Sequence, residues 1–176
     1  RTAVDLAMRR ARPGAAARVH DFEGFYTSGF PAVYRATLAF SGSSDVAAEA
    51  TPEAFVRAVA RGRRLSRAPW ALGWVMTTSL NVARRLARQH PQERGPESDA
   101  AHESDARWVE RLDLVERLAL LPPRQRQAVV LHYLGGFELA EVAQLMNLSI
   151  GGVKSNLFKG REALRRTQEA RDHADD

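Results

Sequence analysis

Apolar residues recur three and four residues apart along most of this chain, the spacing at which side chains share one face of an α-helix. Between residues 21 and 41 many of them are aromatic, and we expect these rings to pack in a core rather than to stack on bases. A Ser- and Gly-containing break at residues 41–44 ends this first helix. Ser44 and Asp45 then supply capping groups for the next helix.

The second helix is predicted over residues 45–62, with Pro52 in its middle. Proline removes a backbone donor and clashes with the preceding turn, so two interpretations remain open. Either the helix kinks at Pro52, or a new helix begins there with Thr51 as its N-cap. A loop rich in arginine follows at residues 61–69 and leads into a third helix over residues 70–89.

This third helix has two distinct faces. The face predicted to be buried carries Val75, Ser79, Val82 and Leu86. The second face gathers, within about 100°, the polar residues Thr77, Asn81, Arg84, Arg85 and Arg88. Arginines suit phosphates while Asn and Thr can bond to bases, so this face and the loop before it favour nucleic-acid binding. A solvated arginine face is the alternative.

The second half of the chain begins after a segment of different composition. Residues 90–106 contain two prolines and almost no large apolar residue, as expected of a flexible acidic linker. Helical spacing returns at residues 108–121 and 124–133, and Gly135-Gly136 interrupts it. The fold class predicted is therefore all-α, with two small helical domains joined by the linker. The expected boundaries are a basic flexible tail at 1–18, a domain at 19–90, the linker at 91–107, a domain at 108–170 and a tail at 171–176.

A helix-turn-helix is predicted within the second domain, from Glu138 to Arg166. Asn147 stands at the turn, where its tolerance of a left-handed backbone is useful, and Ser149 is the N-cap candidate of the following helix. That helix has an apolar face made by Val153, Leu157, Gly160 and Leu164. Its opposite face carries Gly151, Ser155, Phe158, Lys159 and Glu162, with Lys154 at its edge. The pattern favours insertion into a DNA major groove, and a helical hairpin with a solvated face is the alternative.

Composition and charge narrow the function. The chain is 44% hydrophobic and 27% charged, lacks cysteine and has no apolar run near the ~20 residues of a membrane span. Residues 1–90 hold 14 arginines against 6 acidic residues, residues 91–116 hold 3 against 8, and residues 117–176 hold 9 basic against 7 acidic residues. Two basic modules around an acidic linker indicate a polyanionic partner. The five histidines are scattered, and no catalytic motif is visible, so we expect no enzyme, metal or cofactor.

Two long stretches carry a family resemblance: LPPRQRQAVVLHYLGGFELAEVAQLMNLSIGGVKSNLFKGREAL, and DFEGFYTSGFPAVYRATLAFSGSSDVAAEATPEAFVRAVARGRRL followed by WVMTTSLNVARRLAR. The first resembles the C-terminal promoter-binding domain (region 4) of sigma-70 family RNA polymerase sigma factors, and other helix-turn-helix regulators share part of it. The second resembles the core-binding and promoter-melting domain (region 2) of the extracytoplasmic-function (ECF) group. Together they cover about residues 20–90 and 108–167, in the order of that family.

The resemblance implies roles for individual residues. It places docking on the β′ clamp helices of core RNA polymerase at Glu49, Glu53 and Phe55, where the chain departs from the family at Thr51 and Pro52. It likens the loop from Arg63 to Trp70 to one that captures a base flipped from the −10 element. The residues expected there are Arg63, Arg64, Arg67, Trp70, Thr77, Asn81, Arg84, Arg85 and Arg88. The residues expected at the −35 element are Lys154, Ser155, Phe158, Lys159, Arg161 and Arg165.

Three further departures concern the helix-turn-helix. Glu138 replaces the usual Ser/Thr cap, Asn147 replaces the turn glycine, and Asn156 replaces an arginine. The resemblance implies a cytoplasmic, non-catalytic specificity subunit that binds core polymerase (β′ clamp helices and β flap) and promoter DNA, without membrane contact. Members of the group commonly have an anti-sigma factor as a further partner. A transcriptional regulator that acts without polymerase, and a protein-interaction module, are the alternatives.

Overall fold

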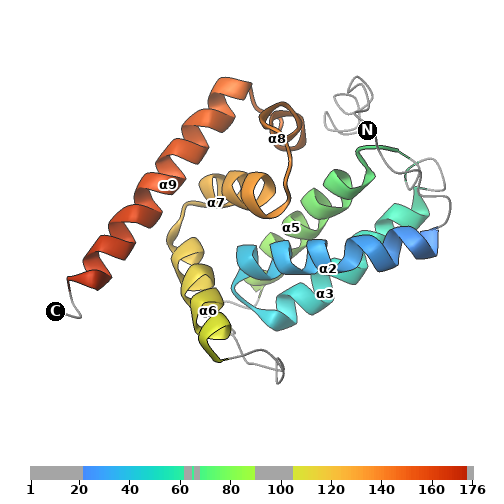
Figure 1. Ribbon diagram of the computed structural model, residues 1–176. Helices are drawn as coiled ribbons and strands as arrows, with labels where there is room; N and C mark the ends of the chain where they lie inside the picture. The colour runs from blue at the N-terminus through green and yellow to red at the C-terminus, as the bar shows by residue number, and fades with distance from the viewer. Residues whose placement is uncertain (1–21, 62–64, 66–67, 90–104, 174–176) are drawn as a thin grey trace.

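The computed structural model describes residues 22–61, 65, 68–89 and 105–173, and every regular element within these ranges is helical. The all-α prediction is confirmed. No helix in the described ranges has the length and apolarity that a membrane crossing requires. The helices, shown in Figure 1, are α2 (Phe22–Ser41), α3 (Ser44–Ala60), α5 (Ala71–Gln89), α6 (Asp105–Leu120), α7 (Pro123–Val129), the π-helix η1 (Val130–Leu134), α8 (Leu139–Met146) and α9 (Ile150–Asp172).

The first half is a bundle in which α2, α3 and α5 all contact one another. The aromatic spacing of α2 places Phe25 in the core, and Phe55 of α3 packs edge-on against it with ring centroids 5.7 Å apart. One buried polar pair joins two of the helices: the hydroxyls of Thr37 and Ser79 lie 2.7 Å apart. The face predicted to be buried on α5 is buried at all four positions.

The alternatives left open at Pro52 are resolved in favour of one helix. α3 runs through Pro52 from Ser44 to Ala60, and Thr51 is a fully buried residue of its interior rather than an N-cap. The N-cap of α3 is Ser43, whose hydroxyl accepts a hydrogen bond from the Val46 N–H at 3.3 Å. The expectation that Ser44 and Asp45 supply the cap was therefore wrong by one residue.

Residues 105–107, predicted to be the end of the linker, belong to α6, which begins at Asp105. The helix predicted over residues 124–133 is also different: α7 passes at Val130 into a π-helical turn that ends before Gly135. Gly136 has a φ of +70°, a left-handed conformation that ends the helical backbone before α8 begins. The basic tail at residues 1–18, the rest of the linker and the last three residues lie outside the described residues.

The two halves pack against each other. α2 contacts α6 and η1, α5 contacts α8, and buried residues of both halves form one continuous apolar cluster. Arg126 of α7 donates to the Phe40 carbonyl of α2 at 2.9 Å, and a Cβ on Gly73 of α5 would lie 3.2 Å from Phe137 and Leu145. α7 and α8 thus separate α9 from the first half, so that α9 lies at one side of the molecule (Figure 1).

Candidate nucleic-acid interface

The turn of the helix-turn-helix forms through local hydrogen bonds. Asn147 adopts the left-handed conformation with φ 53° and ψ 52°, as predicted for the turn. The Ser149 hydroxyl accepts the Gly152 N–H at 3.0 Å, which confirms Ser149 as the N-cap of α9. At the start of α8 the Glu141 carboxylate accepts the Glu138 N–H at 2.9 Å, so the capping expected to be lost at Glu138 is partly restored.

The surface of α9 divides as its sequence predicted. Val153, Leu157 and Gly160 are buried, and a Cβ on Gly160 would lie only 2.9 Å from Val129 of α7. On the other side Lys154, Ser155 and Lys159 are exposed beside Phe158, whose side chain is 59% accessible. Ile150 at the start of the helix is exposed as well. The result is a cationic surface with an apolar centre, which we call the α9 face.

Asn156 lies at the edge of this face. Its side-chain amide donates to the Gly152 carbonyl one turn earlier, at 2.8 Å. That bond holds the amide along its own helix, whereas an arginine at the same position would extend outward. Because Asn156 stands where the resembling family has an arginine, the α9 face has one long cationic side chain fewer than that family would have there.

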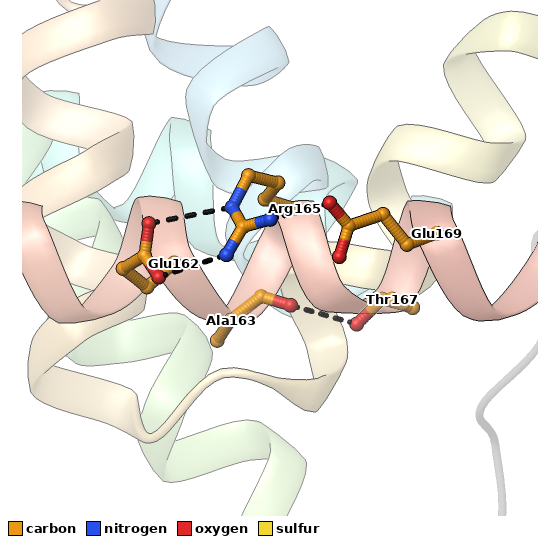
Figure 2. A network of polar contacts seen from close by, with 5 residues as sticks. All are labelled: Glu162, Ala163, Arg165, Thr167 and Glu169. Atoms are coloured by element: carbon orange, nitrogen blue, oxygen red, sulfur yellow. Dashed lines mark hydrogen bonds and ion pairs between the residues drawn. The ribbon is translucent and has the colours of Figure 1, made fainter.

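Two other residues expected near DNA lie further along α9. Arg161 is exposed. Arg165 lies between two carboxylates, with Nη2 3.2 Å from Glu162 Oε2 and with Nη1 bonded to Glu169 (Figure 2). The hydrogen bond and charge of Arg165 lower the pKa of Glu162, and these carboxylates raise the pKa of Arg165. Arg165 is thus already engaged by acidic neighbours.

A second candidate site is a cavity between α3 and α5 with a volume of about 460 Å³. Its lining residues are Arg57, Ala60, Arg61, Trp74, Thr77, Thr78 and Asn81. The Arg61 guanidinium lies over the Trp74 ring, 4.7 Å from its centroid. Among the predicted −10 residues that the structure describes, Thr77 and Asn81 line the cavity. Thr77 is 6% exposed, and its hydroxyl has no hydrogen-bond partner within the described part of the chain.

The sequence did not predict Arg57, Trp74 and Thr78 as site residues. The spacing of Trp74, Thr77, Thr78 and Asn81 at three and four residues marks one side of α5, which was a usable signal. Arg57 comes from a neighbouring helix, and only the packing of α3 on α5 brings it there. Arg63, Arg64 and Arg67 lie outside the described residues, and Trp70 is partly buried against the core.

The three arginines expected to bind −10 phosphates have different environments. Arg84 donates to Gln127 of α7 at 2.7 Å, while burial and the charges of Arg88 and Arg124 lower its pKa. Arg85 donates to both carboxylate oxygens of Glu53, at 3.0 and 3.1 Å. Arg88 is exposed. The structure therefore does not bring the three together on one open surface.

The residues expected to bind polymerase are also separated. Glu49 is exposed on α3. Glu53 forms ion pairs with Arg57 and Arg85, and so joins α3 to α5. The Phe55 side chain is 1% exposed and points into the core, so it is not placed for a direct contact with a partner. Its neighbour Val56 is 66% exposed and was not predicted.

Comparison with known proteins adds independent information. Residues 111–164 match the family model described as sigma-70, region 4. The chain is 32% identical over 146 residues to the ECF RNA polymerase sigma factor SigE of Mycolicibacterium smegmatis, an alignment that covers 76% of this chain and 56% of that protein. It is 35% identical over 51 residues to the ECF RNA polymerase sigma factor SigW of Bacillus subtilis, covering 29% of this chain and 27% of that protein. The chain thus spans about half the length of the first of these curated relatives and about a quarter of the second.

Solved structures share the fold. The sigma factor RpoE of Bartonella quintana, in complex with the anti-sigma factor NepR, superposes with a TM-score of 0.69 at 22% identity, over 86% of this chain and 98% of that one. CnrH, in complex with the cytosolic domain of CnrY, superposes with a TM-score of 0.66 at 18% identity, over 96% of both chains. At this level of identity the similarity concerns the arrangement of helices.

Proposed function

We propose that this chain is a sigma factor, a non-catalytic subunit that directs core RNA polymerase to promoters, because residues 111–164 match sigma-70 region 4 and the chain is similar to ECF sigma factors. The observation that carries the proposal is the α9 face. A capped helix-turn-helix presents two lysines, a serine and an exposed aromatic ring within the segment that matches region 4.

The α9 face fits the −35 element as duplex DNA. The major groove admits an α-helix, and the first residues of a recognition helix reach the base edges. Lys154 and Lys159 supply cationic donors for guanine or phosphate oxygens, and Ser155 can donate or accept. Phe158 offers an apolar contact for a thymine methyl group. The Asn156 amide is bonded to the Gly152 carbonyl of its own helix, so in this proposal the four residues Lys154, Ser155, Phe158 and Lys159 contact the bases.

The cavity between α3 and α5 fits a base taken out of the −10 element. Extruding a base costs a few kcal/mol, which stacking and hydrogen bonds in a pocket offset. Trp74 offers a ring at the wall of the cavity, Asn81 offers both donor and acceptor, and Arg57 and Arg61 supply positive charge for the strand. In this role the first half traps melted DNA while the second half remains on the duplex.

Docking on core polymerase is assigned to the outer side of α3. Glu49 and Val56 are exposed there at helical spacing, and Glu53 is partly exposed between them. Phe55 supports this surface from the core below. An anti-sigma factor is a further partner in this proposal, since the structural neighbour from Bartonella quintana was solved with one.

Run-off transcription with the cognate core polymerase, on templates from a randomised promoter library, tests the function. The chain is expected to give promoter-specific transcripts that core polymerase alone does not produce. Lys154→Ala and Asn81→Ala are expected to lower transcript yield about tenfold or more, since each removes a DNA contact. Arg35→Ala, a change of an exposed cation on α2 that belongs to neither site, is the control and is expected to leave the yield unchanged. The absence of any transcript above core alone would refute the proposal. In that case, tight sequence-specific binding of promoter duplex by the chain alone would favour a regulator.

A further inference from the structure

Glu162 places a negative charge on the side of α9 that the proposed function assigns to DNA. Glu162 comes seven positions after Ser155, and at 100° per residue its side chain returns to within about 20° of the direction of Ser155. Phe158 lies between them on that side, one turn before Glu162. A free carboxylate there would repel the phosphates of a bound duplex.

Arg165 lies one turn beyond Glu162 and binds it with two groups. Nη2 donates to Glu162 Oε2 at 3.2 Å and Nε donates to Glu162 Oε1 at 3.4 Å, so both carboxylate oxygens are engaged (Figure 2). On its far side the same guanidinium bonds to Glu169. The carboxylate of Glu162 is thereby drawn along the helix axis toward its C-terminal end.

We propose that Arg165 is a positioning residue that acts through Glu162: it neutralises this carboxylate and holds it back from the phosphates, and does not itself bind DNA. The inference rests on the proposed function, since it requires a duplex on the α9 face. It revises the sequence-based expectation that Arg165 binds the −35 element. Nε and Nη2 of this guanidinium already donate to Glu162 and Nη1 donates to Glu169, so fewer of its donors are open to a phosphate.

Glu169 supplies the second half of the arrangement. It fixes Arg165 from the opposite end, which orients Nε and Nη2 toward Glu162. Glu169 lies two helical turns beyond Glu162 on α9. Its own charge is therefore far from Lys154, Ser155 and Phe158. Thr167 takes no part, since its hydroxyl donates to the Ala163 carbonyl (Figure 2).

The test measures binding of the full chain to a mixed-sequence 30-base-pair duplex by fluorescence anisotropy over a range of KCl concentrations. Arg165→Ala is expected to weaken binding about three- to tenfold, because Glu162 then faces the phosphates uncompensated. The double variant Glu162→Gln/Arg165→Ala is expected to regain wild-type affinity and wild-type salt dependence. Glu23→Gln, a change of an exposed carboxylate on α2 outside the α9 face, is the control and is expected to stay within twofold of the wild type.

A second readout does not involve DNA. The Glu162 pKa, followed by NMR titration, should rise toward its ordinary value in Arg165→Ala. If the double variant stays as weak as Arg165→Ala, and its salt slope falls by about 0.9 as the loss of one phosphate contact requires, the inference is wrong. An unchanged affinity of Arg165→Ala overturns it as well. If instead Lys154→Ala binds the duplex as well as the wild type, the failure lies with the proposed DNA face itself, and this inference fails with it.

Discussion

Phe55 offers a sharp test because sequence and structure assign it different roles. The family resemblance makes it a polymerase contact, whereas its ring is 1% exposed in the bundle of α2, α3 and α5. Its centroid lies 5.7 Å from Phe25, 4.9 Å from Tyr26 and 6.1 Å from Phe30. We therefore expect Phe55→Ala to act on stability.

The magnitude follows from the burial. Truncating a buried phenylalanine to alanine costs about 3–5 kcal/mol, through lost transfer free energy and the cavity that remains. Each of the three aromatic pairs contributes about 0.5–1.5 kcal/mol beyond burial, which places Phe55→Ala near the upper end of that range. A domain is stable by only about 5–15 kcal/mol, so the loss is a large part of the total.

Urea unfolding followed by circular dichroism measures the change in free energy, and a pull-down with core polymerase measures docking. Val56→Ala is the matched control, since Val56 is the adjacent residue and is 66% exposed. It is expected to change stability by less than about 0.5 kcal/mol while weakening polymerase binding. If Phe55→Ala kept the wild-type unfolding midpoint and lost polymerase binding, the assignment of Phe55 to the core would be refuted.

Three further changes address the helix-turn-helix, each measured by thermal unfolding. Gly160→Ala should destabilise by about 1–3 kcal/mol, since its Cβ would lie 2.9 Å from Val129, and an unchanged melting temperature would show that α7 and α9 pack less tightly. Ser149→Ala should cost about 0.5–2 kcal/mol by leaving the Gly152 N–H without its acceptor, and Ser149→Asp should retain most of the stability. Asn147→Ala should cost about 1 kcal/mol because of its left-handed backbone, whereas a loss of equal size in Asn147→Gly would contradict that cause.

The role of local chemistry is clearest in the helix-turn-helix. The turn at Asn147 and the cap at Ser149 were predicted from residue type and spacing, and both are confirmed. Of the predicted apolar face of α9, Val153, Leu157 and Gly160 are buried and Leu164 is half-buried. These features depend on residues within a few positions of one another, so a linear pattern contains them. The π-helical turn of η1 was not predicted, because nothing in the residues 130–134 distinguishes it from an α-helical continuation.

The sequence by itself determined which segments are helical and which side of each helix is apolar, since both follow from local backbone preference and a fixed angle per residue. It did not determine which polar residues remain open to a partner. Arg84 meets Gln127 across 43 positions, and Arg85 meets Glu53 across 32. Only tertiary packing brings such partners together, because a guanidinium pairs with whatever acceptor the fold places beside it. Tertiary structure alone therefore separated the open α9 face from the arginines already engaged on α5.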